Sequence, residues 1–204
     1  MVRVKICGLT TLNDAEISVK YGADALGFVF AESKRQMKPK QVWNIIRNLP
    51  IFTVKVGVFV NEDPDRILDI ASYCNLDAVQ LHGEEPVNHC KKIAAHFKVI
   101  KAVKVKKRPV YSDFEPYSEY QILLESACES GGSGLTWDWD KLPKKMRNGS
   151  VIVSGGLNVQ NVQKAISSVN PIAVDVASGV EIKPGIKDHK LIKQFISRVK
   201  GIKL

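Results

Sequence analysis

The stretch Val2–Thr10, VRVKICGLT, decides how the fold of this chain is interpreted. It has the pattern of a short buried strand that ends at Cys7, followed by a turn at Gly8 and a threonine able to cap a helix. In a parallel α/β barrel, the carboxyl ends of the strands form the rim at which chemistry takes place. The stretch therefore predicts a thiol at that rim, provided that the remaining sequence builds the barrel.

Further apolar runs repeat this strand pattern along the chain. They are nearly continuous in Val, Ile and Leu, which is typical of strands buried on both faces. Together with the first, the predicted strands are Val2–Ile6, Ala25–Phe30, Val54–Val60, Ala78–Leu81, Val99–Val103, Ile122–Leu124, Val151–Val153 and Ile172–Val176.

Segments with helical periodicity lie between these strands. Pro39 and Pro64 stand where a helix tolerates proline best, in its first turn. The segment Lys104–Tyr120 has no clean period and contains Pro109 and Pro116, so we expect a loop or a single turn in place of a fifth helix. The predicted helices are Leu12–Tyr21, Pro39–Leu49, Pro64–Cys74, Pro86–Phe97, Trp139–Met146, Val159–Val169 and Lys187–Val199.

Strands that alternate with helices in this way fit a closed (β/α)8 barrel or a doubly wound open sheet. A doubly wound nucleotide-binding domain would carry GxGxxG after its first strand, whereas Gly8 stands alone there. Glycine-rich turns follow the sixth, seventh and eighth strands instead, and the phosphate sites of barrels gather after strands seven and eight. We therefore predict a single-domain (β/α)8 TIM barrel over residues 1–204, with a short or missing fifth helix.

The composition is that of an average globular protein, with 45% hydrophobic and 25% charged residues. The formal net charge is +9, but the basic clusters Lys101–Arg108 and Lys144–Arg147 do not alternate with aromatic residues, so we expect no nucleic-acid partner. No apolar run approaches the roughly 18–20 residues that span a bilayer, and the first residues lack the apolar core of a signal peptide. We therefore expect no membrane association and a cytoplasmic location.

The four cysteines, Cys7, Cys74, Cys90 and Cys128, form neither a CxxC pair nor a zinc pattern. In the cytoplasm they should be reduced. Cys74 and Cys90 fall in helical segments, where a small buried apolar residue is the simplest interpretation.

Two glycine loops follow the seventh and eighth predicted strands. Gly155 and Gly156 precede a helix that is expected to begin near Asn158, and Ser178 and Gly179 follow the last strand. Backbone N–H groups approach a phosphate only where no side chain intervenes, and a helix N-terminus adds a favourable dipole. Either loop alone could be a tight turn without a ligand, but two in neighbouring units predict a phosphate site.

A thiol, an imidazole and two carboxylates converge on the predicted rim. Each also has a structural interpretation, because Cys7 can fill the core, His82 can be a hydrogen-bonded structural residue and Asp175 can be a cap. Arg35, after the second strand, suits a carboxylate or a phosphate, or is a solvated surface residue. The residues at the strand ends are Cys7, Phe30, Asn61, His82, Glu125, Ser154 and Asp175.

Short motifs recur in a fixed order along the units: KICGLT, GFVF followed by SKR, VGVFVNE, VQLHGEE, GGSG, SGGLN, and VDVASGVE followed by PGIKD. In this ordered set, which is highly specific, the chain resembles the phosphoribosylanthranilate isomerase family of tryptophan biosynthesis from Lys5 almost to the C-terminus. The resemblance implies a (β/α)8 barrel, a small sugar-phosphate substrate and no metal or organic cofactor. It leaves open whether the protein is a monomer or a homodimer.

The family carries out an Amadori rearrangement of N-(5′-phosphoribosyl)anthranilate. A general acid protonates the furanose ring oxygen and opens the ring to a Schiff base; a general base then removes the C2′ proton, and the enolamine tautomerises to the ketone. The resemblance implies that Cys7 is the base and that Arg35 binds the anthranilate carboxylate. It also implies a substrate-binding set, Gln80, His82 and Asp175, and a phosphate-binding set, Gly132, Ser133, Gly155, Gly156, Ser178 and Gly179.

The chain departs from the family pattern at a few positions. Glu125, in LLES, stands in place of the aspartate that serves as the family's general acid, and we expect it to take that role. Leu135, Trp137 and Ala177 stand in place of a lysine, a phenylalanine and a serine or threonine. We expect nearby positive charge to lower the pKa of Cys7 and burial to raise the pKa of Glu125, which would keep it able to donate a proton.

Two other functions are compatible with these observations. The histidine-pathway sugar isomerase is a sister barrel that performs the same rearrangement, but its base on strand one is an aspartate, where this chain has Cys7. A non-catalytic barrel that binds sugar phosphates is favoured only by Glu125 in the place of the acid.

Overall fold

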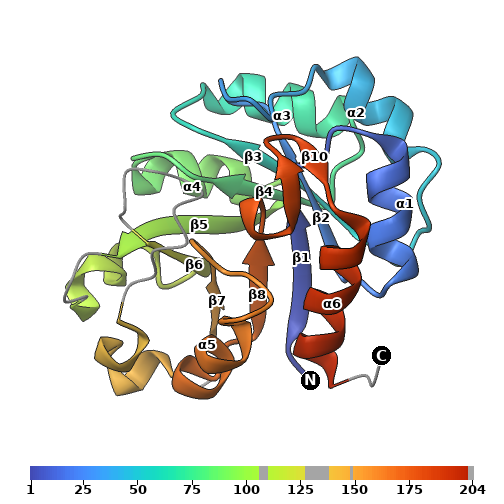
Figure 1. Ribbon diagram of the computed structural model, residues 1–204. Coiled ribbons are helices and arrows are strands. Elements are labelled where there is room, and N and C mark those ends of the chain that lie inside the picture. Colours follow the sequence, from blue (N-terminus) through green and yellow to red (C-terminus); the bar gives the residue numbers. More distant parts are fainter. Residues whose placement is uncertain (106–109, 127–137, 148, 202–204) are drawn as a thin grey trace.

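Eight parallel strands close into a barrel in the computed structural model, with helices packed around it (Figure 1). The structure describes residues 1–105, 110–126, 138–147 and 149–201. The strands pair in sequence order, and β8 returns to pair with β1. Their bounds are β1 Arg3–Cys7, β2 Ala25–Val29, β3 Val54–Phe59, β4 Ala78–Leu81, β5 Lys98–Val105, β6 Gln121–Ser126, β7 Val151–Val153 and β8 Ala173–Val176. The predicted barrel and its eight strands are confirmed.

Within the described residues, six α-helices cover the outside of the barrel: α1 Leu12–Lys20, α2 Pro39–Ile46, α3 Pro64–Tyr73, α4 Val87–Ala94, α5 Val162–Val169 and α6 His189–Lys200. Three of these helices, α1, α3 and α6, begin at a residue whose side chain caps the first turn. The side chain of Thr11 accepts a hydrogen bond from the backbone N–H of Asp14 at 3.1 Å, and Asp63 and Asp188 cap α3 and α6 in the same way. Of the two threonines that follow β1, Thr11 is therefore the cap, whereas the Thr10 hydroxyl donates to the carbonyl of Gly185.

Between β5 and β6 the described residues, 110–120, form no α-helix, as predicted. Two single turns of 3₁₀-helix, η1 Tyr111–Asp113 and η2 Glu115–Tyr117, take its place. The helix predicted over Trp139–Met146 is wrong, because the chain forms two further 3₁₀ turns there, η3 Trp139–Lys141 and η4 Lys144–Met146. Pro143 lies between these turns, and its missing N–H and its ring do not fit the interior of an α-helix.

The start of α5 also differs from the prediction. The helix begins at Val162 instead of Val159, because Asn158 and Asn161 bind each other's backbone. The Asn158 N–H donates to Asn161 Oδ1 at 2.8 Å, and the Asn161 N–H donates to Asn158 Oδ1 at 3.0 Å. Local asparagine turns of this kind compete with the helix and delay its first turn.

A short antiparallel pair, β9 Glu181–Lys183 and β10 Ile186–Lys187, follows β8 through the 3₁₀ turn η5, Ser178–Val180. It folds back towards the loops of the first two units, as the contact of Thr10 with Gly185 shows. This hairpin carries Glu181 and Lys187 to the barrel rim.

The barrel interior has an apolar layer and a polar layer. Side chains alternate along each strand, so every second residue points inward. The apolar layer is built by Ala102, Leu123 and Ile152, packed against Ile100, Ile172 and Ala173. Nearer the carboxyl ends, Lys5, Gln80 and Asp175 are buried against one another. Charged groups inside a barrel are costly unless they are paired, so this layer is a candidate for function.

No helix in the described ranges combines the length and the apolar character needed to cross a membrane.

Candidate active site

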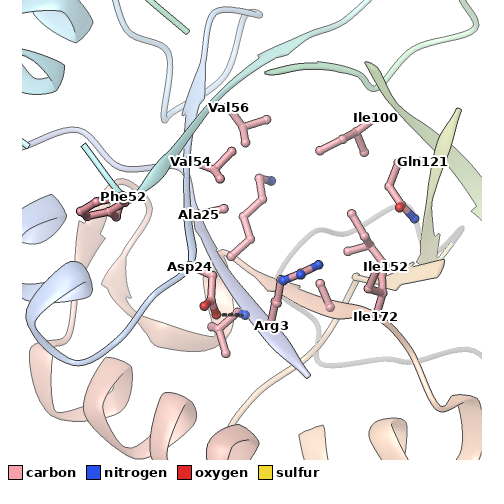
Figure 2. A pocket seen from close by; sticks show the side chains of 13 residues that line it. Arg3, Asp24, Ala25, Phe52, Val54, Val56, Ile100, Gln121, Ile152 and Ile172 are labelled. Carbon is pink, nitrogen blue, oxygen red and sulfur yellow. Dashed lines mark hydrogen bonds between the residues drawn. The ribbon is translucent and has the colours of Figure 1, made fainter. Parts of the chain in front are cut away.

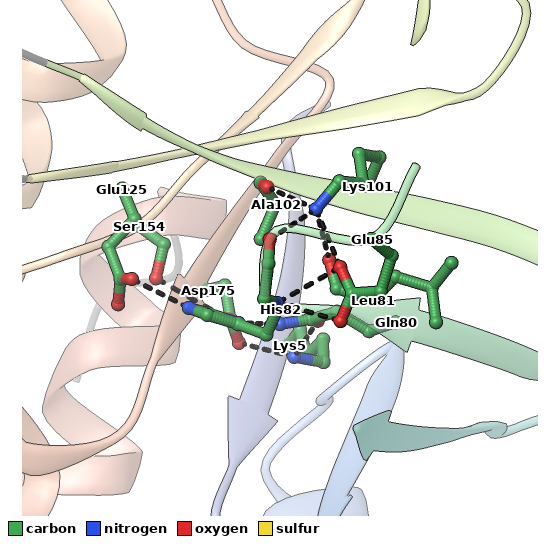
Figure 3. Close-up of polar contacts among 11 residues, drawn as sticks. Lys5, Gln80, Leu81, His82, Glu85, Lys101, Ala102, Glu125, Ser154 and Asp175 are labelled. Carbon is green, nitrogen blue, oxygen red and sulfur yellow. Dashed lines mark hydrogen bonds and ion pairs between the residues drawn. The ribbon is translucent and has the colours of Figure 1, made fainter. Parts of the chain in front are cut away.

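Lys5 lies at the centre of the polar layer in the barrel (Figure 3). Its Nζ donates to Asp175 Oδ1 at 3.0 Å and to Gln80 Oε1 at 2.8 Å. Burial alone would lower the pKa of Lys5, but Asp175 and Cys7 raise it by more, so the net pKa lies above its ordinary value. The lysine therefore stays charged and holds β1, β4 and β8 together through one ammonium group.

Cys7 ends β1 two residues beyond Lys5, on the same inward face. A Cβ atom at Gly27, opposite Cys7 on β2, would lie 2.6 Å from Cys7 Sγ and 3.1 Å from Lys5 Cε. The glycine on β2 thus leaves the space in which the thiol and the lysine lie side by side.

The predicted lowering of the Cys7 pKa is wrong. Burial raises the pKa of the thiol by more than Lys5 and Lys187 lower it. The two lysines do supply the positive charge that was expected, but burial of the thiol and the charge of Asp175 oppose them. This raised pKa favours the protonated thiol at neutral pH.

Glu125 is the last inward-pointing residue of β6. Its carboxylate is hydrogen-bonded to His82, which directly follows β4. His82 Nε2 lies 2.6 Å from Glu125 Oε2, and the two side chains are half-buried. Burial raises the pKa of Glu125, but the hydrogen bond from His82 and the positive charges of Lys104 and Lys5 outweigh it, so the net pKa is lowered. The expectation of a raised pKa is therefore wrong, because it left out the imidazole.

Arg35 packs over the turn that follows Cys7. Gly8 has a φ of +73°, and a Cβ there would lie 2.5 Å from Arg35 Cδ, so glycine is required on both counts. The guanidinium forms a two-pronged ion pair with Glu181, with Nε to Oε1 at 2.8 Å and Nη2 to Oε2 at 2.6 Å. Hydrogen bonding to Glu181 raises the pKa of Arg35 further.

Lys187 and Glu181 were not singled out from the sequence. Lys187 is fully buried and donates to Glu181 Oε1 at 2.9 Å and to the carbonyls of Cys7 and Ala177. Burial lowers its pKa, and Glu181 only partly offsets this. Both residues lie within the motifs VDVASGVE and PGIKD, so the motifs carried the signal. Lys5 was missed as well, because nothing in KICG shows that its lysine points inward.

The loops after β7 and β8 line a cavity of about 130 Å³ at the rim. A Cβ at Gly179 would overlap the carbonyl oxygen of Leu157, so only glycine lets the two loops touch. Gly155 and Gly156 have φ values of +81° and +68°, in the left-handed region that favours glycine. The cavity is lined by Arg35, Glu125, Ser154, Gly155, Gly156, Leu157, Asp175, Val176, Ala177 and Ser178.

The structure thus brings most of the predicted site residues together at the carboxyl rim of the barrel. Gln80 has no exposed surface and contacts Lys5 and His82, so it can act on a ligand only through them. Phe30 and Asn61 have structural roles: Phe30 stacks on Phe59, and the Asn61 side chain accepts from the N–H of Glu84. Gly132 and Ser133, like Cys128, Leu135 and Trp137, lie outside the described residues.

No group of three or more His, Cys, Asp or Glu side chains suited to a metal ion occurs in the part of the chain that the structure describes. A closed barrel with a glycine-lined cavity and acid–base side chains at its carboxyl rim has the defining features of the (β/α)8-barrel enzymes.

Comparison with known proteins narrows this class to one family. Residues 4–198 match the family described as N-(5′-phosphoribosyl)anthranilate (PRA) isomerase, and the chain belongs to that family. It is 54% identical over 205 residues to the N-(5′-phosphoribosyl)anthranilate isomerase of Thermotoga maritima, with 99% of this chain and 100% of the relative covered. The corresponding protein of Geobacter sulfurreducens is 46% identical, with 98% and 100% covered.

Solved structures of the family superpose closely. A phosphoribosylanthranilate isomerase in complex with reduced 1-(o-carboxyphenylamino)-1-deoxyribulose 5-phosphate has a TM-score of 0.88 at 50% identity, covering 99% of this chain and 100% of that chain. A structure of monomers generated from the dimeric phosphoribosylanthranilate isomerase of Thermotoga maritima has a TM-score of 0.87 at 50% identity, with the same coverage. The chain is accordingly an isomerase of tryptophan biosynthesis, which excludes the two other functions that the sequence left open.

Proposed function

We propose that Cys7 and Glu125 are the base and the acid of the Amadori rearrangement that converts N-(5′-phosphoribosyl)anthranilate to 1-(2-carboxyphenylamino)-1-deoxyribulose 5-phosphate. One observation carries the proposal: Arg35, Glu125 and the glycine loops after β7 and β8 line a single cavity. A phosphate held by the loops and a carboxylate held by Arg35 would stretch the substrate across the barrel mouth. Glu125 then lies between the two anchors.

The phosphate end is assigned to Gly155, Gly156, Ser178 and Gly179. Their backbone N–H groups can approach an anion closely, and the Ala177 variation leaves these groups in place. Gly132 and Ser133 belong to the same proposed set through the family resemblance. A relative's complex with a reduced product analogue that carries a 5-phosphate supports a sugar phosphate as the ligand.

In the proposed first step, the Glu125 carboxyl donates its proton to the furanose ring oxygen, and the C1′–O bond breaks to give a Schiff base. The Cys7 thiolate then takes the C2′ proton, and the electron pair moves to form the enolamine. Lys5 and Lys187 lower the pKa of the thiol, so they stabilise this thiolate. The pair Glu125–His82 stabilises the carboxylate that the first step leaves.

A turnover assay tests this assignment. Phosphoribosylanthranilate is generated in situ, and its consumption is followed by the loss of anthranilate fluorescence. We expect Cys7→Ala and Glu125→Gln each to lower kcat by about 10²–10⁴-fold. Cys90→Ala, which removes another buried cysteine, and Glu16→Gln, on the exposed face of α1, serve as matched controls and should keep wild-type kcat. Near-wild-type kcat for Cys7→Ala or Glu125→Gln would refute the role of that residue.

We also propose that the protein is a homodimer that associates through the amino-terminal end of its barrel. In the segment between α2 and β3, the side chains of Ile51 and Phe52 are 81% and 92% exposed. Phe52 borders a mostly apolar cavity of about 360 Å³ whose walls include Val54, Ile100 and Ile172 (Figure 2). An exposed apolar side chain beside an apolar cavity suits a two-fold interface, in which Phe52 of each copy enters the cavity of the other copy.

Sedimentation velocity tests the dimer at micromolar concentration. We expect the wild-type protein to sediment as a dimer and Phe52→Asp as a monomer, whereas Tyr73→Asp, a change of an exposed residue at the end of α3, should stay dimeric. A monomeric wild-type protein would refute the proposal. A base that is a thiol needs a reducing compartment, so we further propose a cytoplasmic location.

A further inference from the structure

A directed line of hydrogen bonds crosses the barrel from Lys5 to Glu125 (Figure 3). Lys5 Nζ lies 2.8 Å from Gln80 Oε1, Gln80 Nε2 lies 2.7 Å from His82 Nδ1, and His82 Nε2 lies 2.6 Å from Glu125 Oε2. The line joins β1, β4 and β6 and has the proposed base beside one end and the proposed acid at the other.

The direction of this line follows from the chemistry of its first member. An ammonium group has three donors and no acceptor, so the group that faces it must accept. Gln80 therefore turns its carbonyl oxygen to Lys5, and its amide nitrogen, which only donates, faces His82. The ion pair of Lys5 with Asp175 at 3.0 Å keeps the ammonium in place, and Gln80 has no exposed surface through which water could substitute.

The amide donor decides which ring nitrogen of His82 carries the hydrogen. Nδ1 must accept from Gln80, so it keeps its lone pair. In a neutral imidazole the hydrogen is then on Nε2, which donates to Glu125 Oε2.

This tautomer controls where Glu125 can hold a proton. Oε2 receives the His82 hydrogen, and His82 has no remaining lone pair to accept from a protonated carboxyl. A proton on Glu125 must therefore be on Oε1. Glu125 lines the rim cavity together with Arg35 and Ser154, so its second oxygen is the one available to a ligand. In the opposite tautomer, with the hydrogen on Nδ1, Nε2 would accept the proton of Glu125 at Oε2, and that proton would face His82 instead of the ligand.

We infer that Gln80 is a positioning residue for the isomerisation: oriented by Lys5, it holds His82 as the Nε2–H tautomer and so directs the acidic proton of Glu125 to Oε1. The catalytic consequence rests on the proposed role of Glu125, whereas the tautomer itself follows from hydrogen bonds of this chain alone. The same arrangement places a donor on the carboxylate that remains after proton transfer, which stabilises it.

Nitrogen-15 NMR of histidine-labelled protein tests the inference directly, because the two ring nitrogens report protonation separately. His82→Gln identifies the His82 signals, and His89, His96 and His189 are internal references. We expect wild-type His82 to be protonated on Nε2 and not on Nδ1. In Gln80→Glu both carboxylate oxygens accept, so we expect His82 to become protonated on Nδ1.

Kinetics of the same variants complete the test. We expect Gln80→Glu to lower kcat by roughly 10²-fold, the lower end for a misdirected acid, with KM changed by less than about threefold. Gln163→Glu adds the same charge on the exposed face of α5 and should match the wild type in both readouts. The wild-type tautomer is determined with His82→Gln as the assignment variant and without Gln80→Glu, so the inference can be refuted even if Gln80→Glu is unstable.

The outcomes separate this inference from the proposed function. Wild-type His82 protonated on Nδ1 in an active enzyme would refute the inference alone. So would Gln80→Glu with an unchanged His82 tautomer or unchanged kcat. A wild-type protein with the expected tautomer and no turnover would refute the proposed function, and with it the catalytic role of Gln80.

Discussion

Arg35 and Glu181 bind each other edge to edge, through two parallel hydrogen bonds of 2.8 and 2.6 Å, although 146 positions separate them in the sequence. Glu181 is almost fully buried and also accepts from Lys187, whereas Arg35 keeps about a quarter of its side chain exposed. The pair uses Nε and Nη2 of the guanidinium, so Nη1 is outside it. Glu181 thus holds the guanidinium in one orientation at the cavity rim.

This geometry predicts a KM effect for Arg35. Arg35→Ala should raise KM by about 10–100-fold, since a hydrogen bond to a charged group contributes about 1.5–3 kcal/mol. Inhibition by inorganic phosphate should be unchanged, because the loops after β7 and β8 hold that end. Steady-state kinetics with phosphate as a competitor measures both quantities. An equal loss of affinity for phosphate would instead place Arg35 at the phosphate end.

The close approach of the loops after β7 and β8 predicts the effect of Gly179→Ala. The new methyl group would overlap the carbonyl oxygen of Leu157, so the loops must separate. We expect weaker binding of sugar phosphates, measured by calorimetry with ribose 5-phosphate. Gly201→Ala is the matched control: its φ is +68°, and nothing lies within 4 Å of the added atom. It should cost stability only, on the order of 1–2 kcal/mol. Equal phosphate affinity in Gly179→Ala and Gly201→Ala would remove this loop from the phosphate site.

The opposite pKa shifts of Cys7 and Glu125 predict the pH dependence of kcat/KM. The pKa of Glu125 lies below its ordinary value of about 4.3, and that of Cys7 above its ordinary value of about 8.5. At a pH between the two pKa values, Cys7 and Glu125 together hold one proton, which is mainly on the Cys7 sulfur. The reactive form has this proton on Glu125 instead, and it makes up a small share of the protein that does not change with pH in this range.

The profile should therefore be flat through the neutral range. It should fall in acid as Glu125 and Cys7 are both protonated, and in base as both are ionised. Glu125→Gln should lose the basic limb, and its residual kcat/KM should rise with pH through the neutral range, because only the ionisation of Cys7 then limits it. An acid limb near neutral pH in the wild-type protein would contradict the lowered pKa of Glu125.

The buried pair Lys101–Glu85 predicts a stability effect next to the site. Lys101 Nζ donates to Glu85 Oε2 at 2.8 Å and to the carbonyl of Gly83, so it anchors the loop that begins with His82. Lys101→Met leaves Glu85 charged and unpaired, which should lower the free energy of unfolding by about 3–5 kcal/mol. Urea unfolding measures this. Lys92→Met breaks an exposed pair with Asp65 and should cost no more than about 1 kcal/mol.

The same pair gives a pH signature. Burial raises the pKa of Glu85, but Lys101 and the backbone N–H of Asn61 lower it by more, so the net pKa is below its ordinary value. The pair therefore stabilises the fold above the unfolded pKa of about 4.3, and this contribution is lost as the pH falls through the folded pKa. In Lys101→Met that acid-dependent loss should become smaller. An unchanged pH dependence would show that Lys101 is not its source.

The sequence alone was enough to predict the barrel, because buried parallel strands appear as short, nearly continuous apolar runs and amphipathic helices as segments with helical periodicity. It also placed Cys7, Glu125 and the glycine loops at the rim, since the carboxyl ends of parallel strands meet at one edge. The helix over Trp139–Met146 could have been rejected from Pro143 alone.

Only the tertiary structure decided the electrostatics. The pKa of Cys7 depends on its burial and on Lys5, Lys187 and Asp175, and that of Glu125 on His82, 43 positions away. Charge interactions depend on distance and on burial, which strand register and hairpin folding set and which spacing along the chain does not show. For the same reason Lys187 and Glu181 became part of the site only once the β9–β10 hairpin had carried them over the mouth of the barrel.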